Sequence, residues 1–377
     1  MNNYPNGQNF TQNGNIGQPN GMPVYPVGQN SPQQQYPGQP VYIPVYPAPP
    51  VFDPKKEEKR KNKKILSSMG FCFGLSIILY VVLSIVLVFA VMGISKFFPA
   101  AKLLLDDSTG TYAYEGIGSI LILGGPFLIS HLILKSKKLT GILPFGTTYN
   151  KKASISLVMM MTPVVLISSI LINLVSMLFQ EAVGLTFESG LEDLSVNGVG
   201  GAFALIISIA FIPAIIEEFC IRGVVLQPLR RYGDFFAIMM SSIIFSILHG
   251  NMVQIPYTIV AGFYFGYVCV ATGSLWPSIV LHFINNLFSA IELIVLENFS
   301  EEVANTVTLV MLGVLVLVGI AGGVIFFKMN YKTKLQKGVT TLKTREKYGA
   351  VLSNPAMIIA IVIMLIITAT SVSSSGA

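Results

Sequence analysis

The sequence predicts an all-α, polytopic transmembrane helix bundle with about eight or nine spans. Of its 377 residues, 53% are hydrophobic and only 11% are charged, and the mean hydropathy is +0.67. A soluble domain carries about twice that charged fraction. The apolar residues also form blocks, and a block of roughly 18 or more is long enough to cross a membrane. These observations exclude a soluble globular protein.

Nine apolar blocks are candidate spans. They lie near residues 65–96, 114–134, 153–179, 199–227, 235–250, 253–272, 275–298, 304–327 and 356–373. The block at 235–250 is the weakest candidate, because it would be only about 24 Å long at a helical rise of about 1.5 Å per residue. The polar sequence His249-Gly250-Asn251 also ends it.

Lysine and arginine residues gather in every second connection between the blocks. With the N-terminus inside, the segments 55–64, 135–152, 222–234 and 328–347 hold 22 of the 24 lysines and arginines. Short loops rich in these residues stay in the cytoplasm. We therefore expect a multi-pass protein of the cell membrane with a cytoplasmic N-terminus and an external C-terminus. The net charge of +6 belongs to these loops, and we expect no nucleic-acid partner.

The remaining sequence divides by composition. Residues 1–54 are rich in Pro, Gln and Tyr and predict a disordered cytoplasmic tail. The basic juxtamembrane segment 55–64 is typical of contacts with anionic membrane lipid. A transmembrane domain is expected over 65–328, followed by a basic cytoplasmic loop at 329–355. Residues 356–377 are expected to form a last transmembrane helix and a short tail.

Ionisable residues inside the apolar blocks are the candidate functional residues, since each costs roughly 2.5–3.5 kcal/mol on membrane-insertion scales. In the run Glu217-Glu218-Phe219-Cys220-Ile221-Arg222, Glu218 and Arg222 are four residues apart and can pair on one helix face. Glu217 points about 100° away, so it can face a cavity and act as a general base. A glutamate–arginine pair at a helix end explains this motif equally well.

Two further polar groups lie in later blocks. Phe245 and His249 are one helical turn apart, and so are His282 and Asn286. The second pair can donate two hydrogen bonds to a developing oxyanion. Each pair alone is also typical of polar contacts between membrane helices. Three such groups in separate blocks must all face protein or water, which favours a shared site.

The order EExxxR, FxxxH and HxxxN in successive membrane helices resembles the CAAX protease and bacteriocin-processing (CPBP, or Abi) family. The similar region covers about 203–293, and the best-known branch of the family is type II CAAX prenyl endopeptidase, which this region resembles. The resemblance implies a polar cavity between the motif helices. It also implies an intramembrane endopeptidase acting on a membrane-associated, lipidated or peptide substrate. In one branch that substrate is a prenylated CAAX terminus, and in bacterial members bacteriocin maturation or self-immunity is proposed.

The resemblance also implies roles for the motif residues. Glu217 looks like the general base that activates the hydrolytic water, and His249 looks like its partner on that water. His282 and Asn286 look like the pair that stabilises the oxyanion.

The other motif residues look like supporting groups. Glu218 and Arg222 would orient the motif helix, and Phe245 accompanies His249.

The types of residue in the motifs do not decide whether the reaction would use a metal ion. Glu217, His249 and His282 would suit a zinc ion with an open water position. Water activation by glutamate and histidine without metal is equally compatible with these residues. We favour the metal-free mechanism, because the HExxH motif of soluble zinc proteases is absent.

Other functions fit the same residues. A catalytically idle scaffold or a bacteriocin self-immunity protein would use the motifs as structural contacts, and a transporter would use them as proton stations. A shared catalytic site requires His249 and Glu217 to lie at a similar depth in the membrane. If the block at 235–250 ran straight outward from Asp234, His249 would lie on the opposite side of the membrane from Glu217. A shared site needs the turn around 227–233 to dip into the protein, or the block to start deep.

Overall fold

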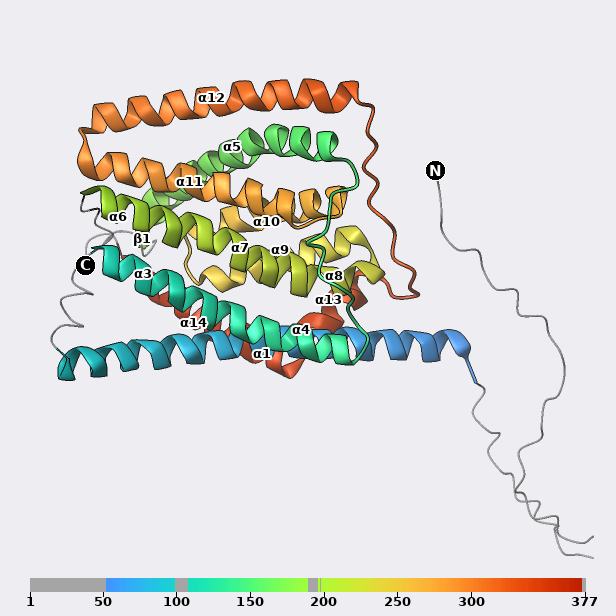
Figure 1. The fold of residues 1–377 in the computed structure, drawn as a ribbon. Coiled ribbons are helices and arrows are strands. Elements are labelled where there is room, and N and C mark those ends of the chain that lie inside the picture. The colour runs from blue at the N-terminus through green and yellow to red at the C-terminus, as the bar shows by residue number, and fades with distance from the viewer. Residues whose placement is uncertain (1–51, 99–107, 189–195, 197, 375–377) are drawn as a thin grey trace, which may run out of the picture. The chain divides into compact units, whose positions relative to one another are not determined.

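Long helices that run back and forth along one direction make up the fold (Figure 1). The computed structural model describes residues 52–98, 108–188, 196 and 198–374. Within these ranges, seven helical stretches are long and apolar enough to cross a membrane, or eight if one bent pair counts as a span. The predicted all-α transmembrane bundle is confirmed. Residues 1–51, which include nearly all of the predicted tail, lie outside the described residues.

The first and third spans have clear sequence signals at their starts. α1 (Pro54–Phe97) begins where the Asp53 carboxylate accepts hydrogen bonds from the backbone N–H groups of Lys55 and Lys56, at 3.0 and 3.2 Å. The basic segment 55–64 is therefore part of this helix. The second span joins α3 (Ser108–Ser119), η1 (Ile120–Gly124) and α4 (Gly125–Ser136). Asn150 caps α5 (Lys151–Val183) in the same way as Asp53.

The span that carries the EExxxR motif alternates between α-helical and π-helical segments. It comprises α6 (Gly198–Leu205), η2 (Ile206–Phe211), α7 (Ile212–Glu218), η3 (Phe219–Leu226), α8 (Gln227–Leu229) and η4 (Arg230–Tyr232). η2 and η3 are π-helical, and such segments often occur at functional sites. The two glutamates lie at the end of the short segment α7, between the two π-helical segments.

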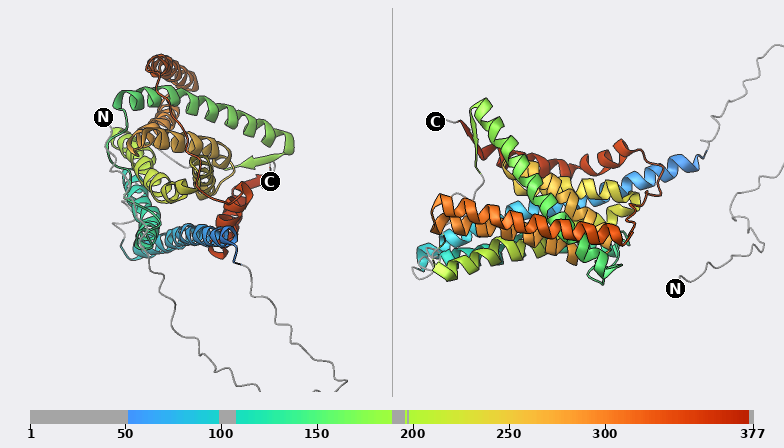
Figure 2. Two further views of the ribbon diagram at one scale, coloured as in Figure 1. Left: turned by 90° about the vertical axis from the view of Figure 1, so that its right-hand side faces the viewer. Right: turned by 90° about the horizontal axis from the view of Figure 1, so that it is seen from above.

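The candidate span at 235–250 is too short to cross the membrane. α9 (Asp234–His249) has 16 residues and ends at Gly250, whose φ of 64° lies in the left-handed region. The chain then turns and returns as α10 (Gln254–Thr272), which packs along α9. Both helices belong to the yellow part of the bundle in Figure 2. Within the described residues this candidate block is therefore not a full span, and the count of up to eight spans agrees with the lower of the two predicted numbers.

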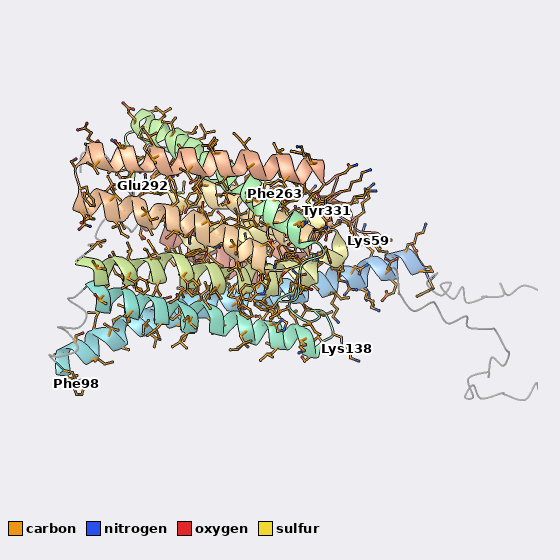
Figure 3. The ribbon with its side chains drawn as sticks, turned by 45° about the horizontal axis from the view of Figure 1, so that its top comes forward. Lys59, Phe98, Lys138, Phe263, Glu292 and Tyr331 are labelled. Carbon is orange, nitrogen blue, oxygen red and sulfur yellow. The ribbon has the colours of Figure 1, made fainter. Side chains whose placement is uncertain are left out.

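The remaining spans are α11 (Trp276–Asn298) and α12 (Glu301–Lys328). α5 crosses α10, α11 and α12 obliquely, as the view from above shows (Figure 2). Lys59 and Lys138 lie at one end of the bundle, and Phe98 and Glu292 lie towards the other (Figure 3). This separation agrees with the charge asymmetry of the sequence, whereas the direction of insertion stays a prediction.

The segment 329–355, expected to be a loop, contains a helix. α13 (Thr344–Leu352) leads into α14 (Pro355–Thr370) with a bend of 76°. After α14, the strand β2 (Val372–Ser374) pairs antiparallel with β1 (Leu185–Phe187), which follows α5. Both α13 and α14 pack against α1. There the core includes Phe73 and Ile77 of α1 and Met357 of α14.

Replacing Gly74 with leucine is expected to weaken the packing of α1 against α14. A Cβ atom at Gly74 would lie 2.4 Å from the backbone nitrogen of Met357, so the two helices would have to separate. Overpacking of this kind typically costs about 1–3 kcal/mol or more. Thermal unfolding of the purified protein in detergent measures the effect. Gly93→Leu on the same helix is the matched control, because a Cβ there meets nothing within 4 Å. Equal shifts in both variants would contradict the prediction.

Candidate active site

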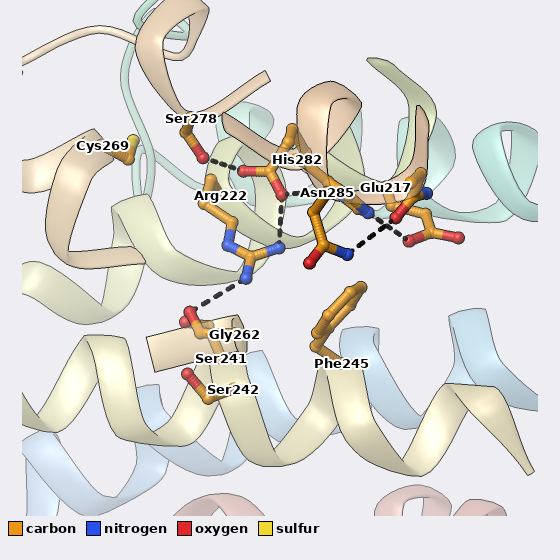
Figure 4. Close-up of polar contacts among 12 residues, drawn as sticks. Glu217, Arg222, Ser241, Ser242, Phe245, Gly262, Cys269, Ser278, His282 and Asn285 are labelled. Atoms are coloured by element: carbon orange, nitrogen blue, oxygen red, sulfur yellow. Dashed lines mark hydrogen bonds and ion pairs between the residues drawn. The ribbon is translucent and has the colours of Figure 1, made fainter. Parts of the chain in front are cut away.

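Glu218 is the centre of a buried polar cluster. Its side chain is fully buried, and its Oε1 atom lies 2.7 Å from Nη1 of Arg222 and 3.0 Å from Nδ1 of His282. The Ser278 hydroxyl donates a hydrogen bond to the second oxygen, Oε2. Figure 4 shows the three partners converging on this carboxylate. The ion pair that the spacing of Glu218 and Arg222 predicted is present. The bonds from Glu218 to His282 and Ser278 join the EExxxR helix to α11 (Trp276–Asn298).

Aromatic rings enclose the positive side of this cluster. The guanidinium of Arg222 lies 4.6 Å from the ring centre of Phe245 and 5.3 Å from that of Phe265, within range of cation–π attraction. Its Nη2 atom donates to the Gly262 carbonyl at 2.9 Å. The His282 ring stacks on Phe265, with ring centres 4.6 Å apart. Phe245 of the FxxxH motif therefore contacts Arg222 directly.

Glu217 lies in different surroundings from Glu218. Its side chain is 22% exposed, and its Oε2 atom is 3.6 Å from Nε2 of His282, which is too long for a hydrogen bond. The carboxylate lines two cavities, of about 200 and 430 Å³. The divergence of the two carboxylates that the helical repeat predicted is therefore observed.

His249 reaches the same depth as Glu217. Both residues line both cavities, so the two motifs meet in one site. His249 can lie at this depth because the EExxxR helix continues past residue 227, where its apolar block ends in the sequence. The turn into α9 comes only at Gly233. Glu217 and His249 are equally far along the chain from Gly233, so similar lengths of helix carry them to similar depth.

Contacts at the start of α9 hold this geometry. The backbone N–H of Asp234 donates to the Gln336 carbonyl at 3.0 Å, and its carboxylate accepts from the Gln336 N–H at 2.9 Å. Arg230 also pairs with this carboxylate at 2.8 Å. The start of α9 is thereby anchored to the lysine-rich loop after α12.

The hydrogen bonds of the two histidines define which ring atoms carry protons. Nδ1 of His249 lies 2.9 Å from the Phe245 carbonyl, which can only accept, so Nδ1 donates. In the neutral ring, Nε2 of His249 is then an acceptor. By the same reasoning Nδ1 of His282 donates to the ionised Glu218, and Nε2 of His282 can donate only when the ring is protonated.

Asn286 and its neighbour Asn285 both line the larger cavity. The Asn286 amide donates to the carbonyl of Ile209 in η2 at 3.1 Å, and its side-chain oxygen accepts from Asn285 at 3.1 Å. Sequence reasoning selected Asn286, four residues after His282, and missed Asn285. A spacing of three residues also places side chains on one helix face, so this signal was available.

Other site residues were missed for different reasons. Ser278 lies four residues before His282, so the same helical spacing could have identified it. Tyr80 of α1 lines the smaller cavity with Glu217 and His249. No motif links Tyr80 to them, because only the packing of α1 brings it there.

The zinc ligand set considered from the sequence does not fit this geometry. In the part of the chain that the structure describes, no three His, Cys, Asp or Glu side chains are grouped so that they could hold a metal ion. We therefore derive no step through a metal.

One family matches the chain at this site. Residues 199–288 match the family described as "Type II CAAX prenyl endopeptidase Rce1-like". The matched segment holds all three motifs and amounts to less than half of the chain. No curated protein and no solved structure matches. The resemblance seen in the motifs is confirmed for this segment, and the match supports a membrane protease. Tyr80 lies outside it.

Proposed function

We propose that this protein is an intramembrane endopeptidase in which Glu217 activates water for attack on a peptide bond. The substrate would be a peptide or protein segment within or at the membrane, lipidated or not. One observation carries the proposal. Two adjacent glutamates lie in one membrane helix. The carboxylate of Glu218 is bonded to buried partners, whereas Glu217 lines a polar cavity together with His249. An ionisable group held in this way is expensive to keep without a function.

The first step is proton removal from water. The water molecule lies between Glu217 and His249, and Nε2 of His249 accepts one of its hydrogens and orients it. The Glu217 carboxylate takes the other proton as the oxygen attacks the carbonyl carbon. This role needs Glu217 ionised, and its 22% exposure allows access to water.

The second step is stabilisation of the tetrahedral oxyanion. His282 would donate from Nε2 as an imidazolium, since Nδ1 already donates to Glu218. The amides of Asn285 and Asn286 supply N–H groups on the wall of the larger cavity, whereas His282 is buried and lines neither cavity. Glu217 then transfers its proton to the leaving nitrogen, the C–N bond breaks, and an amine and a carboxylic acid result.

Hydrolysis in ¹⁸O-labelled water tests the proposal. The purified full chain in lipid vesicles, incubated with membrane-associated reporter peptides, is expected to give products whose new carboxyl group carries one ¹⁸O atom by mass spectrometry. The rate is expected to be unchanged after treatment with a zinc chelator. A rate that falls with the chelator and returns with added zinc would overturn the metal-free mechanism. Absence of labelled product across a broad peptide set would instead favour the idle scaffold or self-immunity function.

A further inference from the structure

The larger cavity extends well beyond the motif residues. Its volume is about 430 Å³, and its wall combines polar side chains from α3, α5, η2, α10 and α11. Besides Glu217 and His249, these polar residues are Glu115, Ser119, Ser169, Asn173, Ser208, Gln254, Tyr257, Asn285, Asn286 and Ser289. By contrast, the cavity between α11 and α12 is lined entirely by apolar residues. Polar groups in a membrane bundle face protein or water, so this cavity is suited to a hydrated, polar occupant.

An extended polypeptide matches the chemistry of this wall. A peptide backbone brings one donor and one acceptor per residue, and each must be satisfied when the peptide leaves water. The amides and hydroxyls along the wall supply both kinds of partner. Glu115 on α3 and Glu217 on α7 line the same cavity, so a peptide bound in it can contact both Glu115 and the carboxylate that we propose as the base.

Glu115 gives this wall a charge. It is the only acidic residue on the cavity wall other than Glu217, and the described residues include no ion pair to it. A carboxylate near low-dielectric surroundings attracts a cation more strongly than one in bulk water. Glu115 also lies outside the segment 199–288 that matches the protease family.

The cavity lies towards the end of the bundle that is poor in lysine. Ser169 and Asn173 are in the second half of α5, which begins with Lys151 and Lys152 at the lysine-rich end. Glu115 likewise lies in the first part of its span, far along the chain from Lys135. Among the residues that the structure describes, no lysine or arginine forms an ion pair with this carboxylate.

We propose that the larger cavity binds the substrate as an extended peptide that carries a lysine or arginine near the scissile bond, with its cationic side chain on Glu115. The peptide would approach from the lysine-poor end of the bundle. This inference rests on the proposed function, because it assigns a substrate class to the same site.

Charge-swapped peptides and a charge-swapped protein test the inference together. A peptide set places lysine or glutamate in turn at each position flanking a cleaved bond. The full chain in lipid vesicles is expected to cleave the lysine peptide on the order of tenfold faster at one position, which corresponds to about 1.4 kcal/mol. Glu115→Lys is expected to reverse this preference, and Glu115→Gln to remove it. Glu292→Lys is the matched control, since Glu292 is half-buried on α11 but does not line this cavity.

The outcomes separate this inference from the proposed function. Cleavage that requires Glu217 but shows no charge preference, or a preference that both Glu115 variants retain, would overturn the inference and leave the endopeptidase intact. An equal change in Glu292→Lys would also overturn it. If no peptide is cleaved, or if Glu217→Gln cleaves at the full rate, the proposed function fails and the inference fails with it.

Discussion

Replacing Glu217 with glutamine is expected to abolish hydrolysis and to leave the folded protein intact. Glutamine has nearly the same shape but cannot take the proton of the attacking water. Loss of a general base typically lowers the rate by roughly 10²–10⁴-fold. The fold should tolerate the change, because the carboxylate is partly exposed and its closest charged contact, with His282, is 3.6 Å long. Initial rates with a cleaved reporter peptide measure the effect.

Two controls make this experiment decisive. Thermal unfolding of Glu217→Gln should match that of the unchanged protein, so that lost activity is not lost structure. Glu292→Gln removes another membrane carboxylate that lines neither cavity at the site, and it should retain the full rate. Undiminished hydrolysis by folded Glu217→Gln would show that Glu217 is not the base.

Replacing Arg222 with methionine is expected to cause the largest loss of stability. It removes the guanidinium from a fully buried carboxylate, which would keep only His282 and Ser278 as partners. Breaking a buried ion pair from one side typically costs about 3–5 kcal/mol, because the remaining charge is uncompensated. The yield of folded protein in detergent and its thermal unfolding temperature measure the loss.

The double variant Glu218→Gln with Arg222→Met tests the cause. It removes both charges, so it is expected to be more stable than Arg222→Met alone. Arg60→Met is the matched control for loss of an arginine. Arg60 pairs with Glu57 at 3.0 Å, but both side chains are at least half exposed, so little change is expected. A double variant as unstable as Arg222→Met would show that the lost aromatic contacts of the guanidinium dominate.

Local signals in the sequence were enough to predict most of the spans and the way the two adjacent glutamates diverge. Apolar length located seven of the nine blocks as full spans, and an eighth corresponds to the bent end of the chain. Helical spacing predicted that Glu218 would pair with Arg222 and that Glu217 would point elsewhere. These features depend on residues within one or two turns of a helix, where the geometry is nearly independent of the rest of the protein.

Features set by packing between distant segments could not be predicted in this way. The block at 235–250 resembles a weak span, and its depth follows from the turn at Gly233 and the bonds between Asp234 and Gln336. Tyr80 reaches the site only because α1 packs against the second span. The partner of Asn286 is a carbonyl in the π-helical segment η2, which no motif in the sequence marks.

The turn after His249 is supported by residues that lie much later in the chain. Gly250 packs so closely on α14 that a Cβ there would lie 3.1 Å from Met364 and 3.3 Å from Ile367. The N–H of Met252 donates to the hydroxyl of Ser371, which is 119 residues later in the chain. A ribosome therefore completes all three motif helices well before it makes the helix that supports this turn. The turn that follows His249 therefore depends on a helix that is made after all three motif helices, and a chain that stops before α14 lacks these contacts.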